Sequence, residues 1–380
     1  MTRKLRLLHI GNGGAFKIKA IVDAMLARGH EVHVVPVPPM AKAFAGTVWH
    51  EMPSGAGLGT LTRLLRVRRL ISRIRPDVVH AHNAWGPGWY AAFAGLHPFV
   101  VHAYGGDLLP EQYRGRPLLH RALTSWTCRL ADRVIVTGEH MVAAARLLGV
   151  EPERCVVIPR GVDVNRFRPG LETANLRREL GIDDDAFVVL SPRYQVDESL
   201  YNLDVVVEAV AALRAVSSRV VCVQMYGAKR EEGVARLRSL VAEKGLTDIY
   251  RFVSAVDNSA MPAYYNLADV TVSVPSSDGF PVTVLEASAC GCPLIVSDLS
   301  YCREWFEPGV NGVIVPAGDA GSLAGALADL AADDDRRRRI GRAGRSLVLE
   351  RANYERCMDR LEALYLELLG EEQAALRGAH

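Results

Sequence analysis

The stretch Ser273–Asp298, which reads SVPSSDGFPVTVLEASACGCPLIVSD, decides the fold class of this 380-residue chain. An apolar strand leads into it and ends in a polar loop. Pro281 then marks the start of an apolar helix, because proline is favoured at the first helical position, where its missing amide would have no partner. Gly291 ends the helix, and a second apolar strand runs from Pro293 to Ser297. Strand, helix and strand in this order predict one βαβ unit of a parallel sheet.

Two carboxylates stand out in this unit. Asp278 lies in the loop, and Glu286 is the only charged residue between Gly279 and Ser297. A lone carboxylate is costly to bury in so apolar a helix unless something donates a hydrogen bond to it. The helix N-terminus offers free amides and a positive dipole end to phosphate or sugar oxygens. A ligand with hydroxyls and a phosphate would satisfy all of these features, whereas the simpler alternative is that Glu286 extends to solvent and Asp278 caps the turn.

The spacing of these acids carries a resemblance. Asp278, seven residues and Glu286, within SDGFP and LEASACGCP, resemble the acid-(seven residues)-acid motif of retaining GT-B glycosyltransferases. The most similar set is the large family that contains sucrose synthase and the bacterial phosphatidylinositol mannosyltransferases. There the first acid, usually Glu, contacts the donor sugar, and the second holds the ribose hydroxyls of the nucleotide. The resemblance therefore implies that Asp278, with the backbone of Gly279 and Phe280, holds the sugar and that Glu286 holds the ribose.

Further residues of the second half complete the implied donor site. Pro281 and Val282 begin the helix beside the acidic loop, and we expect them to line the same site. Arg193 follows the strand Phe187–Leu190 and is expected to clamp the diphosphate, because a guanidinium matches phosphate oxygens bidentately.

The second half also departs from the family at one position. The family commonly has a lysine five residues after this arginine, but the chain has Glu198 there. Lys229 or Arg230, at the end of the next strand, would then supply the missing charge.

The chain begins with a second Rossmann-like pattern. The apolar strand Leu5–Ile10 runs into the glycine-rich loop Gly11–Gly14, and a helix and the strand Val32–Val35 follow. The second strand lacks the ribose-binding acid of the dinucleotide fingerprint. Glycines allow a ligand to approach the backbone closely. In the resemblance, this loop, with Gly13 and Gly14, faces the donor phosphates and the acceptor.

Polar residues follow two more predicted strands, Asp77–His82 and Phe99–His102. Ligands of open α/β sheets bind at the carboxyl ends of strands. The residues that fall there are His82, Asn83, His102, Gly105, Gly106 and Asp107. A lone histidine is usually structural, but this cluster favours a site. In the family, a histidine at the position of His102 lies beside the donor sugar, so His102 is a catalytic candidate, and the loop after it lines the acceptor pocket.

Alternating strands and helices predict an α/β protein, and the resemblance implies the GT-B architecture of two Rossmann-like domains facing across a cleft. We expect the boundary near Gly170. Residues 1–170 would then bind the acceptor and residues 171–354 the nucleotide-sugar. The terminal helix, at about 355–380, is expected to pack back on the first domain.

Composition excludes several classes of function. Lys and Arg number 45 against 43 acids, a net charge of +2, which argues against nucleic acid as a partner. The seven cysteines lack paired spacing, which suits a reduced cytoplasm and argues against zinc at Cys290 and Cys292. No signal peptide or 18-residue apolar stretch occurs, so a cytoplasmic location is expected. The basic helix Leu61–Ile74 allows peripheral membrane contact, although a solvated face is the simpler interpretation.

The implied reaction is transfer of a hexose from a UDP- or GDP-linked sugar to a small-molecule, lipid or glycan acceptor, with retention at the anomeric carbon. The nucleotide-sugar is a co-substrate, and no other cofactor is expected. No convincing Asp-x-Asp cation site is present, so we expect metal-independent activity. Two alternatives stay open: a nucleotide-sugar 2-epimerase on the same fold, which needs no acceptor, and a non-catalytic sugar-nucleotide sensor. The oligomeric state is also open.

Overall fold

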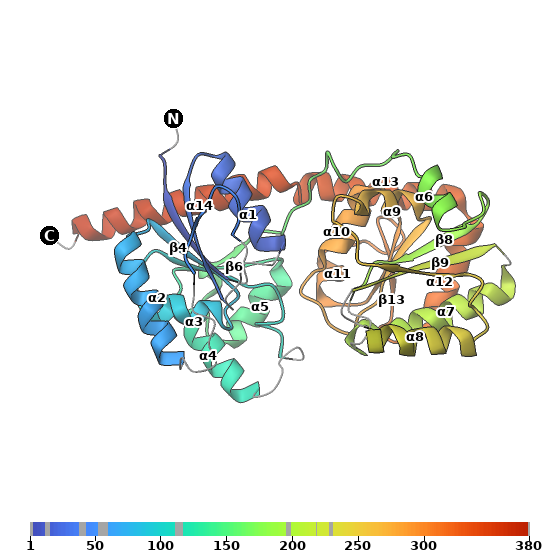
Figure 1. Cartoon of the computed structure of the whole chain (residues 1–380), viewed down its shortest axis with the longest axis horizontal. Helices are drawn as coiled ribbons and strands as arrows, with labels where there is room; N and C mark the ends of the chain where they lie inside the picture. Colours follow the sequence, from blue (N-terminus) through green and yellow to red (C-terminus); the bar gives the residue numbers. More distant parts are fainter. Residues whose placement is uncertain are drawn as a thin grey trace. The chain divides into compact units, whose positions relative to one another are not determined.

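The structure is a computed structural model that describes residues 3–11, 16–37, 43–51, 60–110, 117–194, 199–217, 219–227 and 231–378. The chain forms two compact units (Figure 1): the first comprises Met1–Arg160 and Glu355–His380, and the second comprises Gly161–Tyr354. The sequence pattern placed the boundary near Gly170, whereas the two units divide between Arg160 and Gly161. The reason is local, because Val162 already exchanges backbone hydrogen bonds with Ala352 and Tyr354 of the second unit.

Among the described residues, the first unit contains a parallel sheet of seven strands in the order β3-β2-β1-β4-β5-β6-β7. The strands are β1 (Arg6–Gly11), β2 (Glu31–Pro36), β3 (Val48–Trp49), β4 (Val78–His82), β5 (Phe99–His102), β6 (Arg133–Val136) and β7 (Cys155–Val157). Strand β1 has β2 on one side and β4 on the other, so the strand order reverses beside β1. Ligands of doubly wound sheets bind at the carboxyl ends of the strands next to such a reversal.

The helices of the first unit are α1 (Phe16–Ala27), α2 (Thr60–Ile74), α3 (Pro87–Ala94), α4 (Pro117–Leu130), α5 (Glu139–Leu147) and α14 (Tyr354–Gly378), with a 3-10 turn η2 (Pro152–Arg154). One face of the sheet packs into a hydrophobic cluster that includes Leu8, Val79 and Val101. Side chains alternate between the two faces of a strand. His9, His80 and His102, their neighbours in β1, β4 and β5, therefore belong to the opposite face.

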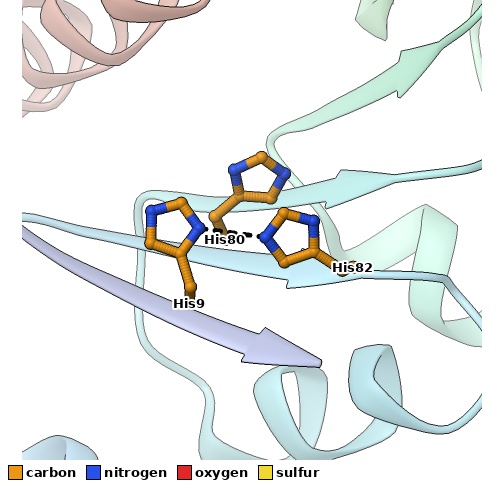
Figure 2. A group of neighbouring side chains, drawn as sticks. All are labelled: His9, His80 and His82. Atoms are coloured by element: carbon orange, nitrogen blue, oxygen red, sulfur yellow. Dashed lines mark hydrogen bonds between the residues drawn. The ribbon is translucent and has the colours of Figure 1, made fainter. Parts of the chain in front are cut away.

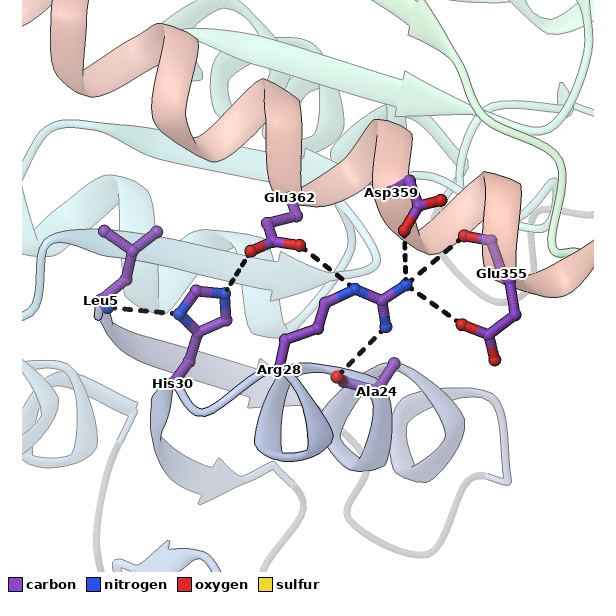
Figure 3. Close-up of polar contacts among 7 residues, drawn as sticks. All are labelled: Leu5, Ala24, Arg28, His30, Glu355, Asp359 and Glu362. Atoms are coloured by element: carbon purple, nitrogen blue, oxygen red, sulfur yellow. Dashed lines mark hydrogen bonds and ion pairs between the residues drawn. The ribbon is translucent and has the colours of Figure 1, made fainter. Parts of the chain in front are cut away.

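Helix α14 joins the first unit through a charged contact at its start, which Figure 3 shows. The guanidinium of Arg28, just after α1, lies 2.7 Å from Asp359 and 3.1 Å from Glu362, and its Nη2 lies 3.2 Å from Glu355. His30 also bonds Glu362, at 3.1 Å. The side chains of Arg28 and Glu362 are 16% and 14% exposed, so this ion pair is less screened by solvent than an ordinary surface pair, whereas Glu355 and Asp359 are mostly exposed. These contacts join the start of α14 to the first unit.

Among the described residues, the second unit holds a parallel sheet of six strands in the order β10-β9-β8-β11-β12-β13. The strands are β8 (Phe187–Ser191), β9 (Val220–Tyr226), β10 (Tyr250–Ser254), β11 (Val270–Ser273), β12 (Leu294–Ser297) and β13 (Val313–Val315). The helices are α6 (Ala174–Glu179), α7 (Leu203–Val216), α8 (Glu231–Glu243), α9 (Met261–Leu267), α10 (Val282–Ala289), α11 (Ser300–Trp305), α12 (Ala320–Ala332) and α13 (Asp334–Arg351), with a 3-10 turn η3 (Ser199–Tyr201).

Both faces of the second sheet are covered. Val188 and Leu190 of β8 enter one hydrophobic cluster, whereas Phe187 and Val189 enter another. The strands therefore read as continuous apolar runs, as expected for a parallel sheet buried on both sides. The predicted βαβ unit is confirmed, since β11 and β12 pair in parallel on either side of α10 in the chain. Pro281 is the extended N-cap residue and not the first helical residue, which is Val282.

Candidate active site

The second unit brings Arg193 and Asp278 into direct contact. Arg193 follows β8, and its Nη1 lies 3.1 Å from a carboxylate oxygen of Asp278 in the loop before α10. Its Nη2 donates a hydrogen bond of 2.8 Å to Ser273 at the end of β11, and its guanidinium carbon lies 4.8 Å from the centre of the Tyr201 ring. Arg193 is only 8% exposed. The two residues that the sequence assigned to diphosphate and sugar thus form one ion pair, in which Arg193 is buried and the Asp278 side chain is 18% exposed.

Three polar atoms on the chain segments that carry or follow Arg193 and Asp278 are buried without a hydrogen-bond partner among the described residues. They are Nε of Arg193, Oγ of Ser191 at the end of β8, and Oγ1 of Thr283 in the first turn of α10. A buried polar group that lacks a partner costs about 1–3 kcal/mol. The first amides of α10 also have no partner within the helix. A ligand rich in anionic oxygens would satisfy these donors.

The loop between β11 and α10 holds a strained residue. Phe280 has a backbone φ of 125°, which side chains rarely adopt, and such conformations cost about 1–3 kcal/mol. Its side chain is buried against Tyr301 and Trp305, with ring centres 4.9 and 4.6 Å away. Its amide donates to Asp278 at 3.3 Å. Packing of the aromatic ring therefore holds the Gly279–Phe280 backbone in one conformation beside the ion pair.

Glu286 is buried in α10 and does not extend to solvent, so the simpler alternative for this residue is wrong. Asn258 donates to its Oε1 at 3.0 Å, and the hydroxyl of Tyr265 donates to its Oε2 at 2.9 Å. Burial raises the pKa of Tyr265 far above its usual value, and the neighbouring Glu286 carboxylate raises it further. The phenol therefore stays a donor across the physiological range of pH. A carboxylate can accept about four hydrogen bonds, so these two donors do not by themselves exhaust Glu286.

Several residues that the sequence singled out lie outside the described part of the chain. They are Gly13, Gly14, Glu198, Lys229 and Arg230. Val282, by contrast, is described as the first residue of α10.

In the first unit, His102 lies at the end of β5 and is 3% exposed. Its ring stacks on that of Tyr104, with centres 4.3 Å apart and planes at 17°. The ring of His80 lies nearly parallel to it at 5.5 Å. These aromatic neighbours restrict the orientation of the His102 ring.

Hydrogen bonds link the other histidines of this face. Nδ1 of His9 lies 2.9 Å from Nε2 of His82, and Nδ1 of His82 lies 2.9 Å from the hydroxyl of Tyr104 (Figure 2 shows the histidines). Nδ1 of His80 lies 2.5 Å from the hydroxyl of Tyr365 in α14. Burial lowers the pKa of His9 to about 3 and the pKa of His80 well below its usual value, so both rings are neutral at pH 7.

Asp107 braces the two loops after β4 and β5. Its buried carboxylate accepts hydrogen bonds from the backbone amides of Ala84 at 2.8 Å, Tyr104 at 3.1 Å and Gly105 at 3.2 Å. The structure thus joins His82, His102 and the Asp107 loop at one edge of the sheet. The sequence missed Tyr104, Asn258 and Tyr265, and their aromatic or neutral side chains carry no charge pattern that marks them.

Comparisons with known proteins follow the division into units. The protein-family sequence model described as glycosyl transferases group 1 matches residues 172–347 of the chain. The family model described as Glycosyltransferase Family 4 matches residues 11–166. The chain is 32% identical over 318 residues to a D-inositol 3-phosphate glycosyltransferase of Geodermatophilus obscurus, covering 80% of this chain and 69% of the relative. It is 30% identical over 389 residues to the protein of that description from Thermomonospora curvata, covering 92% and 89%.

Solved structures share the fold. The chain resembles Anabaena HepE in complex with UDP and glucose, with a TM-score of 0.81, 18% identity and coverage of 95% of this chain and 99% of that one. It also resembles the sucrose-phosphate synthase of Thermosynechococcus elongatus, with a TM-score of 0.79, 19% identity and coverage of 96% and 100%. The expected α/β class and GT-B fold are confirmed. Among the described residues, no helix is long and apolar enough to cross a membrane.

Proposed function

Because this chain belongs to the group 1 glycosyltransferases, we propose that it transfers a hexose from a UDP- or GDP-linked sugar to a small-molecule, lipid or glycan acceptor. The configuration at the anomeric carbon would be retained. Relatives described as D-inositol 3-phosphate glycosyltransferases make a phosphorylated cyclitol the first acceptor to test. HepE, which shares the fold, is described in complex with UDP-glucose, which supports a nucleoside-diphosphate sugar as donor.

We assign donor binding to the second unit. Glu286, held by Asn258 and Tyr265, would accept hydrogen bonds from the ribose hydroxyls. Arg193 would bind the diphosphate through its unpartnered Nε–H and the remaining guanidinium hydrogens. Asp278 orients that guanidinium and, with the fixed Gly279–Phe280 backbone, would contact the sugar. Pro281 and Val282, which start α10, would place its first amides toward the phosphates.

Lys229 or Arg230 would add positive charge at the diphosphate, and Gly13 and Gly14 would allow close approach of donor and acceptor. These four residues enter the proposal from their sequence positions alone. The donor site then needs no divalent cation, because guanidinium, hydroxyl and amide donors would neutralise the departing phosphate.

The proposed reaction breaks the bond between the anomeric carbon and the diphosphate oxygen and forms a bond from the same carbon to the acceptor oxygen on the same face. The departing phosphate would take the acceptor proton. His102, held by stacking on Tyr104, would contact the donor sugar in the transition state. We assign acceptor binding to the loop after β5, which Asp107 braces.

One observation carries the proposal: the Arg193–Asp278 pair, with the unpartnered Nε–H of Arg193, lies in the same unit as Glu286, whose carboxylate accepts hydrogen bonds from two neutral donors. A thermal-shift panel of UDP, GDP, ADP and dTDP tests the donor site. A ligand at a hundred times its Kd should stabilise the protein by about 2.7 kcal/mol.

The reaction itself is tested by incubating the matching nucleotide-sugar with and without a cyclitol phosphate. Transfer to the acceptor, with the anomeric configuration read by NMR, is the expected result. Conversion of the donor sugar to its 2-epimer without acceptor would identify an epimerase. Binding of the donor with neither sugar transfer nor slow hydrolysis of the donor would identify a sensor.

A further inference from the structure

Three histidines of neighbouring strands meet on one face of the first sheet (Figure 2). His9 of β1 pairs in register with His80 of β4. His82 follows His80 by two residues, so both side chains leave the same face of the strand. All three are at most 1% exposed. One ring nitrogen from each can be chosen such that all lie within 4.8 Å of one another.

Hydrogen bonds to two tyrosine hydroxyls decide which ring nitrogens of His80 and His82 stay available to bind a metal. The Nδ1 atoms of His80 and His82 lie 2.5 and 2.9 Å from the hydroxyls of Tyr365 and Tyr104. If these Nδ1 atoms carry the protons, each Nε2 presents a lone pair. Nε2 of His82 lies 2.9 Å from Nδ1 of His9, whereas Nε2 of His80 is buried and has no hydrogen-bond partner among the described residues.

This arrangement has the chemistry of a metal site. An unpaired buried ring nitrogen is destabilising unless something binds it. Three neutral imidazoles are a typical ligand set for zinc and its neighbours in the transition series. Histidines that bind metals almost always use the other ring nitrogen in a hydrogen bond to an outer partner, as His80 and His82 do with the two tyrosines.

We propose that Nδ1 of His9, Nε2 of His80 and Nε2 of His82 bind one transition-metal ion of the zinc class. Zinc lies about 2.0–2.1 Å from imidazole nitrogen, which separates two tetrahedral ligands by roughly 3.4 Å. The 2.9 Å contact between His9 and His82 therefore opens slightly, and the His80 ring turns inward. Every ring stays neutral: His80 and His82 keep their proton on Nδ1, and the proton of His9 resides on Nε2.

The ion would join β1 to β4 and, through the His80–Tyr365 hydrogen bond, to α14. All three ligands of the ion belong to the first unit, whereas Arg193, Asp278 and Glu286 belong to the second. The role of the ion is structural, and its binding is therefore measurable without substrate.

The test uses the full chain, stripped with a chelator and then titrated with Zn²⁺ by calorimetry. We expect one equivalent to bind and to raise the Tm. Co²⁺ in place of Zn²⁺ should give the visible absorption of a tetrahedral ion. X-ray absorption fine structure of the Zn²⁺ protein should show three imidazole ligands, and this reading needs no variant.

His9→Gln and His82→Gln each remove one ligand and should lower Zn²⁺ affinity by about 100-fold or more, while Tyr365→Phe should lower it by about 10–100-fold. His33→Gln is the matched control, because His33 belongs to a different imidazole pair, 2.8 Å from His50. That variant should bind like the parent.

Failure of the stripped chain to bind Zn²⁺ would overturn the proposal, as would fewer than three imidazoles around the ion. It would also be overturned if His9→Gln and His82→Gln bound Zn²⁺ like the parent, or if His33→Gln abolished binding. In each of these cases the three rings do not hold the ion together.

Discussion

Replacement of Glu286 by alanine should damage nucleotide binding and stability together. The proposed ribose hydroxyls lose a charged acceptor, and a hydrogen bond to a charged group is worth about 1.5–3 kcal/mol. Nucleoside diphosphate affinity should therefore fall by between roughly tenfold and 150-fold. The same change leaves Asn258 and the buried Tyr265 hydroxyl without their acceptor, at about 1–3 kcal/mol for each group left unsatisfied.

Two variants separate these effects. Tyr265→Phe keeps the Glu286 charge and removes one donor to it, so it should lower affinity by less than Glu286→Ala. Glu307→Ala is the control, because Glu307 is an exposed carboxylate of the same unit. The assay is calorimetric titration with the nucleotide that stabilises the parent, after circular dichroism has established that each variant is folded. A folded Glu286→Ala protein that binds this nucleotide like the parent would refute the ribose assignment.

The remaining predictions concern the phosphates and the sugar. Arg193→Ala should be nearly inactive, because the diphosphate loses its bidentate partner; steady-state turnover close to that of the parent would exclude this role. His102→Ala should lower kcat more than donor affinity, and a change in affinity alone would identify a structural histidine. Activity should survive excess EDTA when it is assayed well below the Tm of the metal-free chain, and a loss that Mg²⁺ or Mn²⁺ but not Zn²⁺ restores would contradict metal independence at the diphosphate. Lys229→Ala should impair donor binding while Glu198→Lys is tolerated or tightens it; unchanged binding in the first variant would show that the substitute charge comes from elsewhere.

Most strands were predictable because burial on both faces leaves a continuous apolar run. The predicted strand Phe99–His102 coincides with β5, and the predicted strand Phe187–Leu190 ends one residue before β8 does. Helix α3 was missed because it is apolar on all sides and begins with Pro87 and Gly88, so it lacks the helical period. Helix α4 was missed for the opposite reason: it buries polar residues such as His120 and Thr124 while leaving Leu118 84% exposed.

The acidic motif located the candidate site, but its internal contacts could not be predicted. Glu286 was recognisable as a lone carboxylate in an apolar helix. Its partner Asn258 lies just before α9 and its partner Tyr265 lies in α9, and only the fold brings both to α10. A neutral side chain gives no pattern from which such a contact can be inferred. The sequence singled out His82 because it ends a predicted strand. The position of His9 beside His80 and His82 depends on the strand order, which the sequence pattern did not predict.

The family motif usually has Glu at the position of Asp278, and the ion pair with Arg193 shows what the shorter acid contacts here. A shorter acid at the first position reaches less far, and here its Oδ2 contacts Arg193 at 3.1 Å while the Phe280 amide bonds Oδ1 at 3.3 Å. Arg193 has five N–H donors, and Asp278 and Ser273 engage its two terminal nitrogens. The buried Nε–H has no partner among the described residues. The carboxylate therefore fixes the guanidinium in one orientation with donors still available, which favours Asp278 as the residue that positions the phosphate clamp as well as one that contacts the sugar.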